Sequence, residues 1–168
     1  MAKPMEGTFP PYFSRYIDLV KETKVTDALQ TQSDLIENYF DTLEAKADYA
    51  YAPGKWTLKE MLQHMIDTER IFCFRALCFA RQEKANIPGF EEDEYAANSH
   101  ANDRTWKSLC EEMKVVRKST RLLYESFSTD DFMHSGSANN KPVSVLALGF
   151  MTVGHVYHHV NVIKERYL

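Results

Sequence analysis

Two histidines near the end of the sequence have the spacing of a metal site. His155 and His159 are four residues apart in the run GHVYHH, and residues at this spacing lie one above the other on an α-helix. Leu148, Met151 and Val162 fall on the same helical face, so we expect both imidazoles to point into an apolar core. Paired histidines of this kind bind zinc in metalloproteases, although the HExxH motif of those enzymes is absent here.

A third imidazole is available from another apolar segment. His64 shares its helical face with Met61, Met65 and Phe72, so it is also predicted to point inward. Three histidines from two helices would leave at least one metal coordination position open, as in catalytic zinc sites. The alternative is that His64 is a hydrogen-bonded core residue, the commoner role of a lone buried histidine. An all-imidazole donor set favours Zn or Ni, with Cu, Fe or Mn as the alternatives.

Carboxylates close to His64 are candidates to orient it. Metal-bound histidines usually donate their second ring N–H to a carboxylate or a carbonyl oxygen, and Glu60, Asp67 and Glu69 are all within five residues of His64. The alternative interpretation places these carboxylates on a solvated helix face or in an ion pair between helices. No residue is assigned a catalytic role, and no binding motif for an organic cofactor is found.

A connection of about 18 residues, from 86 to 103, follows the second long periodic segment. Loops of this length are often site walls or lids. His100 is therefore a candidate to line the mouth of a cavity, and Tyr95 and Arg104 are candidates to contact an anionic substrate. His158 and His134 are expected to face a neighbouring helix or solvent instead of the metal.

Four long segments with helical periodicity must position these residues. Their approximate bounds are 26–43, 57–84, 103–127 and 143–167. Thr57 and Glu60 form a capping-box pattern at the start of the second segment, Ser144 is a candidate cap for the fourth, and a short helix is expected at 12–20. Glycine and proline cluster between the segments, and no strand is predicted. Four amphipathic helices pack most simply as a four-helix bundle, so the predicted fold class is all-α.

Composition and charge narrow the class of protein. A chain of 168 residues with 44% hydrophobic and 26% charged residues suits one ordinary globular core. We therefore expect a single domain over residues 1–168, with residues 1–24 as an N-terminal extension. The net charge is −4 without a basic cluster, which argues against nucleic acid as a partner. No apolar stretch approaches the ~20 residues of a membrane span and no signal peptide is found, so no membrane partner is expected.

The cysteines and the common catalytic motifs give no alternative site. Cys73, Cys78 and Cys110 form no CxxC motif, and their odd number argues against a closed set of disulfides. A cytoplasmic location is therefore expected. Cys73 and Cys78 lie among apolar residues, where a thiol is expected to be inert. No Glu-x-x-His pair, GxGxxG, P-loop or GxSxG motif occurs.

Taken together, these motifs resemble the DinB-like superfamily from about residue 25 to the C-terminus. The motifs that carry the resemblance are Trp56-Thr57, His64-x-x-x-x-Glu69, Gly154-His155-x-x-x-His159 and the final Glu165-Arg166-Tyr167-Leu168. The resemblance implies a four-helix bundle with up-down-down-up topology and a divalent metal held by His64, His155 and His159. It also implies a homodimer, and Glu69 matches the family pattern.

The resemblance implies a range of activities as well. Relatives include S-transferases that use bacillithiol, mycothiol or glutathione, and a mycothiol-dependent maleylpyruvate isomerase. We therefore expect a divalent-metal-dependent enzyme, foremost a thiol-dependent S-transferase that joins a low-molecular-weight thiol cosubstrate to a small electrophilic substrate. The alternatives are a metal-dependent hydrolase and a non-catalytic, dimeric helical-bundle interaction module. An enzyme needs an open cleft beside the metal, whereas an interaction module needs an exposed apolar patch.

Overall fold

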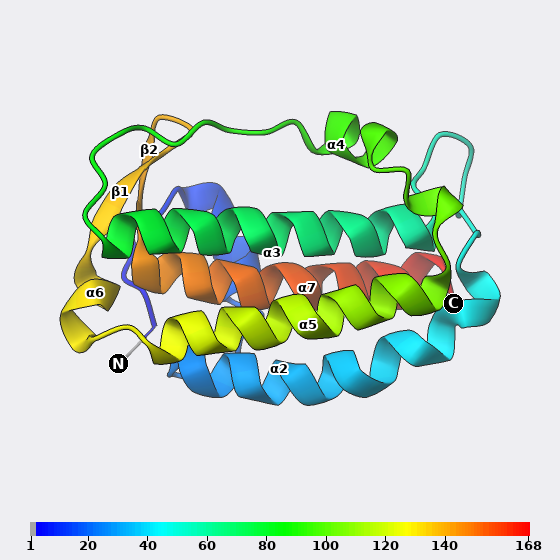
Figure 1. The fold of residues 1–168 in the computed structure, drawn as a ribbon, viewed down its shortest axis with the longest axis horizontal. Coiled ribbons are helices and arrows are strands. Elements are labelled where there is room, and N and C mark those ends of the chain that lie inside the picture. The colour runs from blue at the N-terminus through cyan, green and yellow to red at the C-terminus, as the bar shows by residue number, and fades with distance from the viewer. Residues whose placement is uncertain (1–2) are drawn as a thin grey trace.

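Four long helices form the body of the molecule (Figure 1). The structure is a computed structural model that describes residues 3–168. The long helices are α2 (Val25–Tyr39), α3 (Leu58–Ala80), α5 (Trp106–Glu125) and α7 (Val145–Arg166). Helices α2 and α7 run in one direction and α3 and α5 in the other (Figure 1). The predicted all-α fold and its up-down-down-up order are therefore confirmed.

Side-chain caps begin three of these helices. Thr57 and Glu60 form a reciprocal capping box at the start of α3, Thr105 caps α5, and the Ser144 hydroxyl accepts from the Ala147 N–H at the start of α7. Each cap gives a partner to a backbone N–H that the helix itself cannot satisfy. The predicted capping box and the Ser144 cap are both confirmed.

The long helices are shorter than the periodic segments predicted from the sequence. Helix α2 ends at Tyr39 and the chain continues as a 3-10 turn over Phe40–Lys46. Helix α3 ends at Ala80, because Gln82 adopts a left-handed backbone with φ of 61°. The helix expected at 12–20 is reduced to a 3-10 turn over Pro11–Phe13 and one turn of helix, α1 (Ser14–Ile17).

Two short strands correct the expectation that the chain contains no sheet. Strand β1 (Ser135–Ala138) pairs antiparallel with β2 (Lys141–Ser144). Asn139 and Asn140 form the turn between them with φ of 49° and 57°, the left-handed conformation that a tight hairpin requires and that Asn tolerates. The Asn-Asn pair is the sequence signal for this hairpin, but four-residue strands are too short to show a clear alternation.

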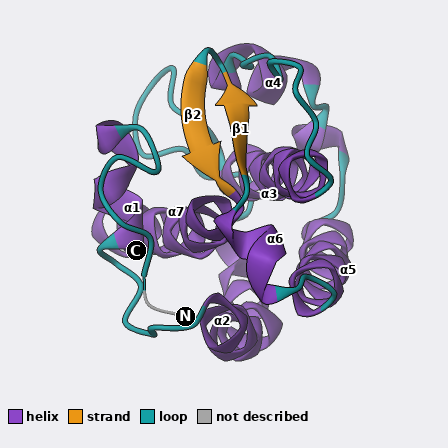
Figure 2. Cartoon of the chain, turned by 90° about the vertical axis from the view of Figure 1, so that its left-hand side faces the viewer, coloured by secondary structure: helices purple, strands orange, loops and turns teal. Residues whose placement is uncertain are grey.

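The remaining elements surround α7 and α3. Helix α4 (Glu92–Asn98) and a 3-10 turn over Ala101–Asp103 lie in the long connection, and α6 (Thr129–Met133) precedes the hairpin. Seen end on, α1 covers the face of α7 that the other long helices leave open (Figure 2). This explains why α7 is apolar on nearly all sides. None of the helices in residues 3–168 combines the length and apolar character that a membrane crossing requires.

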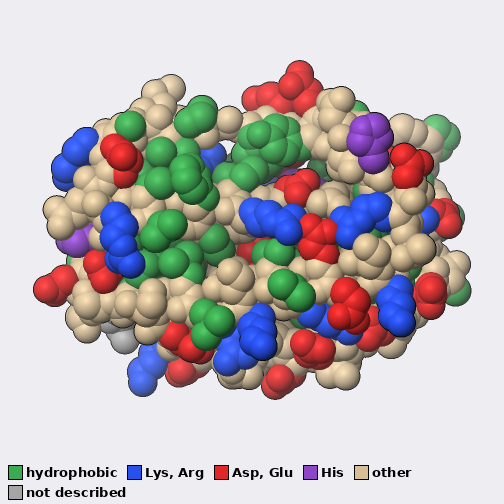
Figure 3. Space-filling model, viewed as in Figure 1, with side chains coloured by type: hydrophobic (Ala, Val, Ile, Leu, Met, Phe, Trp, Pro, Cys, Tyr) green, Lys and Arg blue, Asp and Glu red, His purple; other side chains and the backbone are tan. Residues whose placement is uncertain are grey.

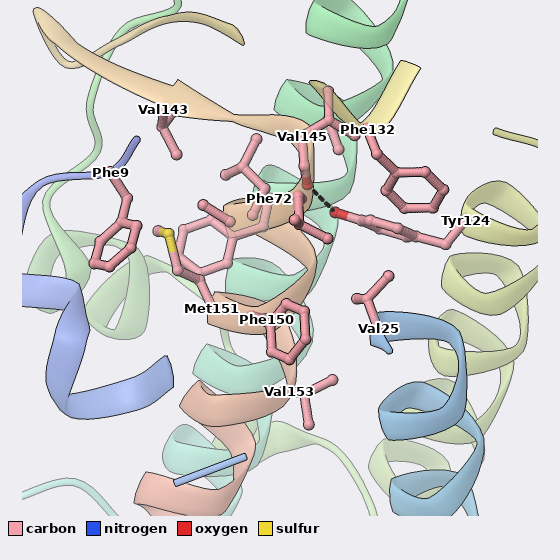
Figure 4. Close-up of a cluster of buried hydrophobic side chains, with 14 of the residues drawn as sticks. Phe9, Val25, Phe72, Tyr124, Phe132, Val143, Val145, Phe150, Met151 and Val153 are labelled. Carbon is pink, nitrogen blue, oxygen red and sulfur yellow. Dashed lines mark hydrogen bonds between the residues drawn. The ribbon is translucent and has the colours of Figure 1, made fainter. Parts of the chain in front are cut away.

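Apolar side chains fill the bundle in two clusters. One cluster includes Phe72, Tyr124 and Phe150 (Figure 4), and the other includes Leu62 and Trp106. All four long helices contribute to both clusters. The bundle therefore has two apolar halves along its length.

A layer of buried polar side chains lies between these halves and ties the four long helices together. Arg117 of α5 donates to both carboxylate oxygens of Glu69 on α3, at 2.8 Å each, and to the Gln32 side-chain oxygen of α2 at 2.6 Å. Gln32 donates in turn to the Val153 carbonyl of α7 at 2.8 Å, and the Thr120 hydroxyl donates to Glu69 at 2.7 Å. Each of these buried polar groups is thus satisfied, which makes the layer compatible with a stable core.

Candidate metal centre

Three imidazoles from two helices meet in the interior of the bundle. The Nε2 atom of His155 on α7 lies 3.0 Å from Nε2 of His64 on α3 and 3.0 Å from Nε2 of His159, one turn further along α7. The candidate ligand atoms of the three residues all lie within 4.8 Å of one another. No other group of three or more histidine, cysteine, aspartate or glutamate side chains converges in this way within residues 3–168.

The donor set fits a divalent metal ion. His64 and His155 are buried and His159 is half-buried, and burial lowers the pKa of His64 to about 4 and the pKa of the other two well below the usual value. The imidazoles are therefore neutral, and each has a nitrogen lone pair to offer. Two of the nitrogen–nitrogen separations are close to the ~3.3 Å expected between ligands of a tetrahedral zinc ion.

A cavity of about 320 Å³ opens beside His155. The surface is hollowed between the 86–103 connection and α3 (Figure 3), and Gly89, Phe90 and Glu92 of that connection line the cavity. A smaller cavity of about 260 Å³ borders His159 on the other side. His155 and His159 each border a cavity that a small molecule can enter, and the long connection forms part of the wall of the larger one, as predicted.

A sequence model of the DinB superfamily matches residues 28–163. The chain belongs to the DinB superfamily. Among solved structures, it is similar to YfiT from Bacillus subtilis, described as "a probable metal-dependent hydrolase with an unusual four-helix bundle topology". The TM-score is 0.67 at 16% identity, covering 97% of this chain and 90% of that chain.

A second similar structure is a mycothiol-dependent maleylpyruvate isomerase, with a TM-score of 0.64 at 15% identity. The match covers 87% of this chain but only 61% of that chain. A search of curated protein sequences finds no match. At these identities the structural likeness establishes the shared fold, so the chemistry must be argued from the site itself.

Glu69, which matches the DinB pattern, does not contact His64. Its two oxygens bind Arg117 and Thr120 in the buried polar layer. Five residues of helix correspond to a rotation of about 140°, so Glu69 points to α5 while His64 points to α7. Of the two alternatives considered for Glu69, the structure therefore shows the ion pair between helices and not a carboxylate that orients His64.

The other carboxylates near His64 also have different partners. Glu60 accepts from the Thr57 N–H within the capping box and from the Asn102 side chain. Asp67 accepts from the Gln63 side chain at 2.9 Å. The buried Nδ1 of His159 has no hydrogen-bond partner among the described residues. Within residues 3–168, none of the three imidazoles forms a hydrogen bond or an ion pair with a carboxylate.

The three residues expected to contact substrate lie elsewhere. Tyr95 is 49% exposed and packs on Phe90, and His100 is exposed beside Asp103. Arg104 donates to Gln63 and to Glu112. None of the three lines either cavity that borders the histidines. The short helix α4 turns the connection so that Phe90 and Glu92, and not these three residues, face the cavity.

The remaining histidines stand apart from the triad. The half-buried ring of His158 lies 5.2 Å from the ring of Tyr16, and Nδ1 of His134 lies 3.3 Å from the Ala80 carbonyl oxygen. His158 therefore faces a neighbouring helix, as predicted, and His134 is only partly exposed.

Tyr16 is not among the predicted site residues, yet its ring packs edge-on against His155 at 5.5 Å. A Cβ atom at Gly154 would lie 2.1 Å from the Tyr16 carbonyl oxygen, so only glycine allows α1 to approach α7 this closely. Burial raises the pKa of Tyr16 to about 12, which keeps its hydroxyl protonated at neutral pH. Tyr16 and the residues that it meets on α7 are at least 138 positions apart in the sequence. No local sequence pattern predicts such a contact.

Thr68 and Arg75 were not predicted as site residues, although the sequence contains a signal for them. They follow His64 by four and eleven residues, positions that return to the same helical face. Both are buried and both line the larger cavity with His155. Their positions on the face of α3 that carries His64 are therefore the sequence signal for both residues.

Proposed function

We propose that this protein is a divalent-metal-dependent enzyme that joins a low-molecular-weight thiol to a small electrophilic substrate. The observation that carries the proposal is the convergence of three neutral imidazole nitrogens, one of which, from His155, belongs to a residue that lines a cavity of about 320 Å³. Three protein ligands leave a coordination position for an outside group. When bound, a divalent ion supplies a Lewis acid that favours the deprotonated form of a thiol or of water. Zn and Ni suit the imidazole donors best.

The chain's own cysteines support an external thiol. Burial raises the pKa of Cys73 and of Cys110 to about 12, and the three cysteines of the described residues are unpaired. Neither Cys73 nor Cys110 lines the cavities beside the histidines. The nucleophile of an S-transfer reaction must therefore enter from solution, and the reducing cytoplasm that we propose as the location supplies such thiols.

The residues around the cavity can bind and shield a small molecule. Phe72 and Met151 provide apolar walls next to His155, and Tyr16 keeps its hydroxyl proton near the same ring. Apolar walls limit the access of water to a bound reactant. These residues position reactants, and we assign none of them a role in proton transfer.

A metal-dependent hydrolase is the second candidate. It is favoured by the likeness to YfiT, whose description names a hydrolase, and it needs the same open coordination position for water. The two reactions are separated by supplying either a thiol with an electrophile or an activated ester alone.

We also propose that the protein is a homodimer that uses no nucleic-acid or membrane partner. Exposed apolar side chains are present on α3, at Phe74 and Leu77, and on α5, at Val115 and Leu122. Apolar side chains gather on this face of the molecule (Figure 3). Neighbouring apolar residues of this kind mark contact surfaces. They also support a non-catalytic interaction module, which would need no metal.

The experiment begins with metal content, measured by plasma mass spectrometry on untagged protein. We expect about one divalent ion per chain in the wild type and none in His159→Ala, with His158→Ala, the adjacent histidine, as the matched control. Wild type, both variants and metal-free protein are then assayed with bacillithiol, mycothiol or glutathione against chlorodinitrobenzene, and with nitrophenyl acetate without thiol. Metal retained by His159→Ala, or thiol transfer that survives metal removal, would contradict the proposal.

A further inference from the structure

Arg75 is a buried guanidinium without an anionic partner. The residue is 6% exposed, and none of the ion pairs within residues 3–168 includes it. One nitrogen, Nη2, donates to the Pro88 carbonyl oxygen at 2.9 Å, and Nε is buried with no partner. Burial lowers the pKa of Arg75 from its usual value, which reflects the cost of holding this charge away from water.

The other buried arginine, Arg117, differs from Arg75 in its hydrogen-bond partners. Arg117 is 1% exposed, and each of its three guanidinium nitrogens donates to Glu69 or to Gln32. The same fold therefore pairs one buried guanidinium fully and leaves the other unpaired. An unpaired buried charge destabilises a protein. No described residue of the chain supplies the anion that would pair with Arg75.

Thr68 repeats this feature on the same face of α3. Its hydroxyl oxygen is buried and has no hydrogen-bond partner among the described residues. Thr68 and Arg75 both line the larger cavity, and Phe72 lies between them in the sequence. One wall of the cavity thus presents a hydroxyl, an aromatic ring and a guanidinium in order, starting one turn beyond the metal ligand His64.

The remaining walls are mainly apolar and narrow the class of ligand. Leu148, Met151 and Val143 line the cavity from α7 and the hairpin, while Lys141 and Glu92 are exposed residues of opposite charge that also border it. The charges of Lys141 and Glu92 offset each other, so the one uncompensated charge is that of Arg75. A single cation matches one negative charge, as in a carboxylate, better than the two charges of a phosphate.

We propose that this cavity binds an apolar monocarboxylate whose charged end pairs with Arg75 and whose other end reaches His155. Arg75 on α3 and His155 on α7 both line the cavity, so a ligand whose charged end is held by Arg75 can extend to the edge of the histidine cluster. The body of the ligand packs on Phe72 and Met151, and the Thr68 hydroxyl can donate to a polar atom along its length. The inference rests on the proposed function in taking this cavity as the place where a reactant lies.

The test is a binding measurement with 4-phenylbutyrate as the probe and 4-phenylbutanol as its uncharged match. Calorimetry on wild-type protein, with and without metal, should show that the carboxylate binds at least 10-fold more tightly than the alcohol. Arg75→Gln should remove this difference without changing metal content, whereas Arg81→Gln, at the C-terminal end of α3, should keep it. Equal affinity for the two probes, or an unchanged preference in Arg75→Gln, overturns the inference.

Stability separates a ligand-binding role of Arg75 from a structural one. Arg75→Gln removes an unpaired buried charge, so the ligand-free variant should unfold at a urea concentration equal to or above that of the wild type. A structural role would give a clear loss of stability instead. Because binding is measured on metal-free protein as well, loss of the metal site and failure of the carboxylate site remain distinguishable.

Kinetic measurements identify which reactant provides the carboxylate. Arg75→Gln should raise KM for 4-(bromomethyl)benzoate relative to 4-methylbenzyl bromide if the electrophile is the carboxylate. It should raise KM for N-acetylcysteine relative to N-acetylcysteamine if the thiol is the reactant that carries the carboxylate. An equal effect of the variant on the charged and uncharged members of both pairs overturns the inference.

Discussion

Replacing Glu69 with glutamine should destabilise the fold and leave metal binding intact. In Glu69→Gln, the buried guanidinium of Arg117 loses the opposite charge that two hydrogen bonds of 2.8 Å now join to it. The new amide also places N–H groups where the guanidinium N–H groups need an acceptor. Both side chains are at most 2% exposed, so water cannot replace the lost partner.

The expected magnitude follows from this burial. Removing one partner of a buried ion pair costs about 3–5 kcal/mol, which corresponds to a fall in Tm of roughly 10 °C for a chain of this length. Metal affinity should stay within about a factor of two, because Glu69 contacts none of the three histidines. A carboxylate that oriented His64 would instead lower metal affinity about 10- to 100-fold when changed to the amide.

Urea unfolding monitored by circular dichroism gives the stability, and competition with a chromophoric chelator gives the metal affinity. Glu112→Gln is the matched control. Glu112 pairs with Arg70 and Arg104 at the surface, with 22% of its side chain exposed, so its loss should cost less than about 1 kcal/mol. A Glu69→Gln variant with wild-type stability and a metal affinity reduced 10-fold or more would refute the reasoning.

Three further variants or measurements probe other parts of the structure. Gly154→Ala should lower Tm by several degrees and disturb the Tyr16 fluorescence environment, because its Cβ would meet the Tyr16 backbone at 2.1 Å; unchanged stability would show that α1 packs differently. Cys73, whose pKa is raised to about 12, should react with a thiol reagent at pH 7.5 about 1,000-fold more slowly than in urea, as checked by peptide mass spectrometry; equal rates would refute the raised pKa. Phe74→Glu should convert the proposed dimer to a monomer in light scattering, and a persistent dimer would exclude that face.

The residues of the triad could be predicted because helical spacing alone brings two of them together. His155 and His159 occupy one face of α7 by their separation of four, and the apolar neighbours of His64 indicate an inward direction. The start of α3 could also be predicted, because a capping box is a local interaction. These features depend on residues close together in the chain.

The partners of the candidate site could not be predicted in the same way. Glu69 binds Arg117, which is 48 residues away, and this pairing depends on how α3 and α5 are rotated against each other. The packing of Tyr16 on His155 similarly depends on the glycine contact between α1 and α7. Helix periodicity gives the direction of a side chain within its own helix, but the packing of distant helices decides what it meets.

The two buried arginines have different roles: Arg117 stabilises the bundle, whereas we propose that Arg75 binds a ligand. Arg117 joins the four long helices through satisfied hydrogen bonds, so its layer stabilises the frame that holds the histidines. Arg75 contributes no comparable contact and leaves a buried charge facing the cavity. A fold that tolerates such a charge does so where a ligand completes it, since natural proteins keep destabilising groups mainly at functional sites. Suppose that Arg75→Gln is more stable to urea than the wild type and binds the carboxylate and the alcohol with equal affinity. Arg75 then lowers the stability of the protein while it provides the binding of the carboxylate.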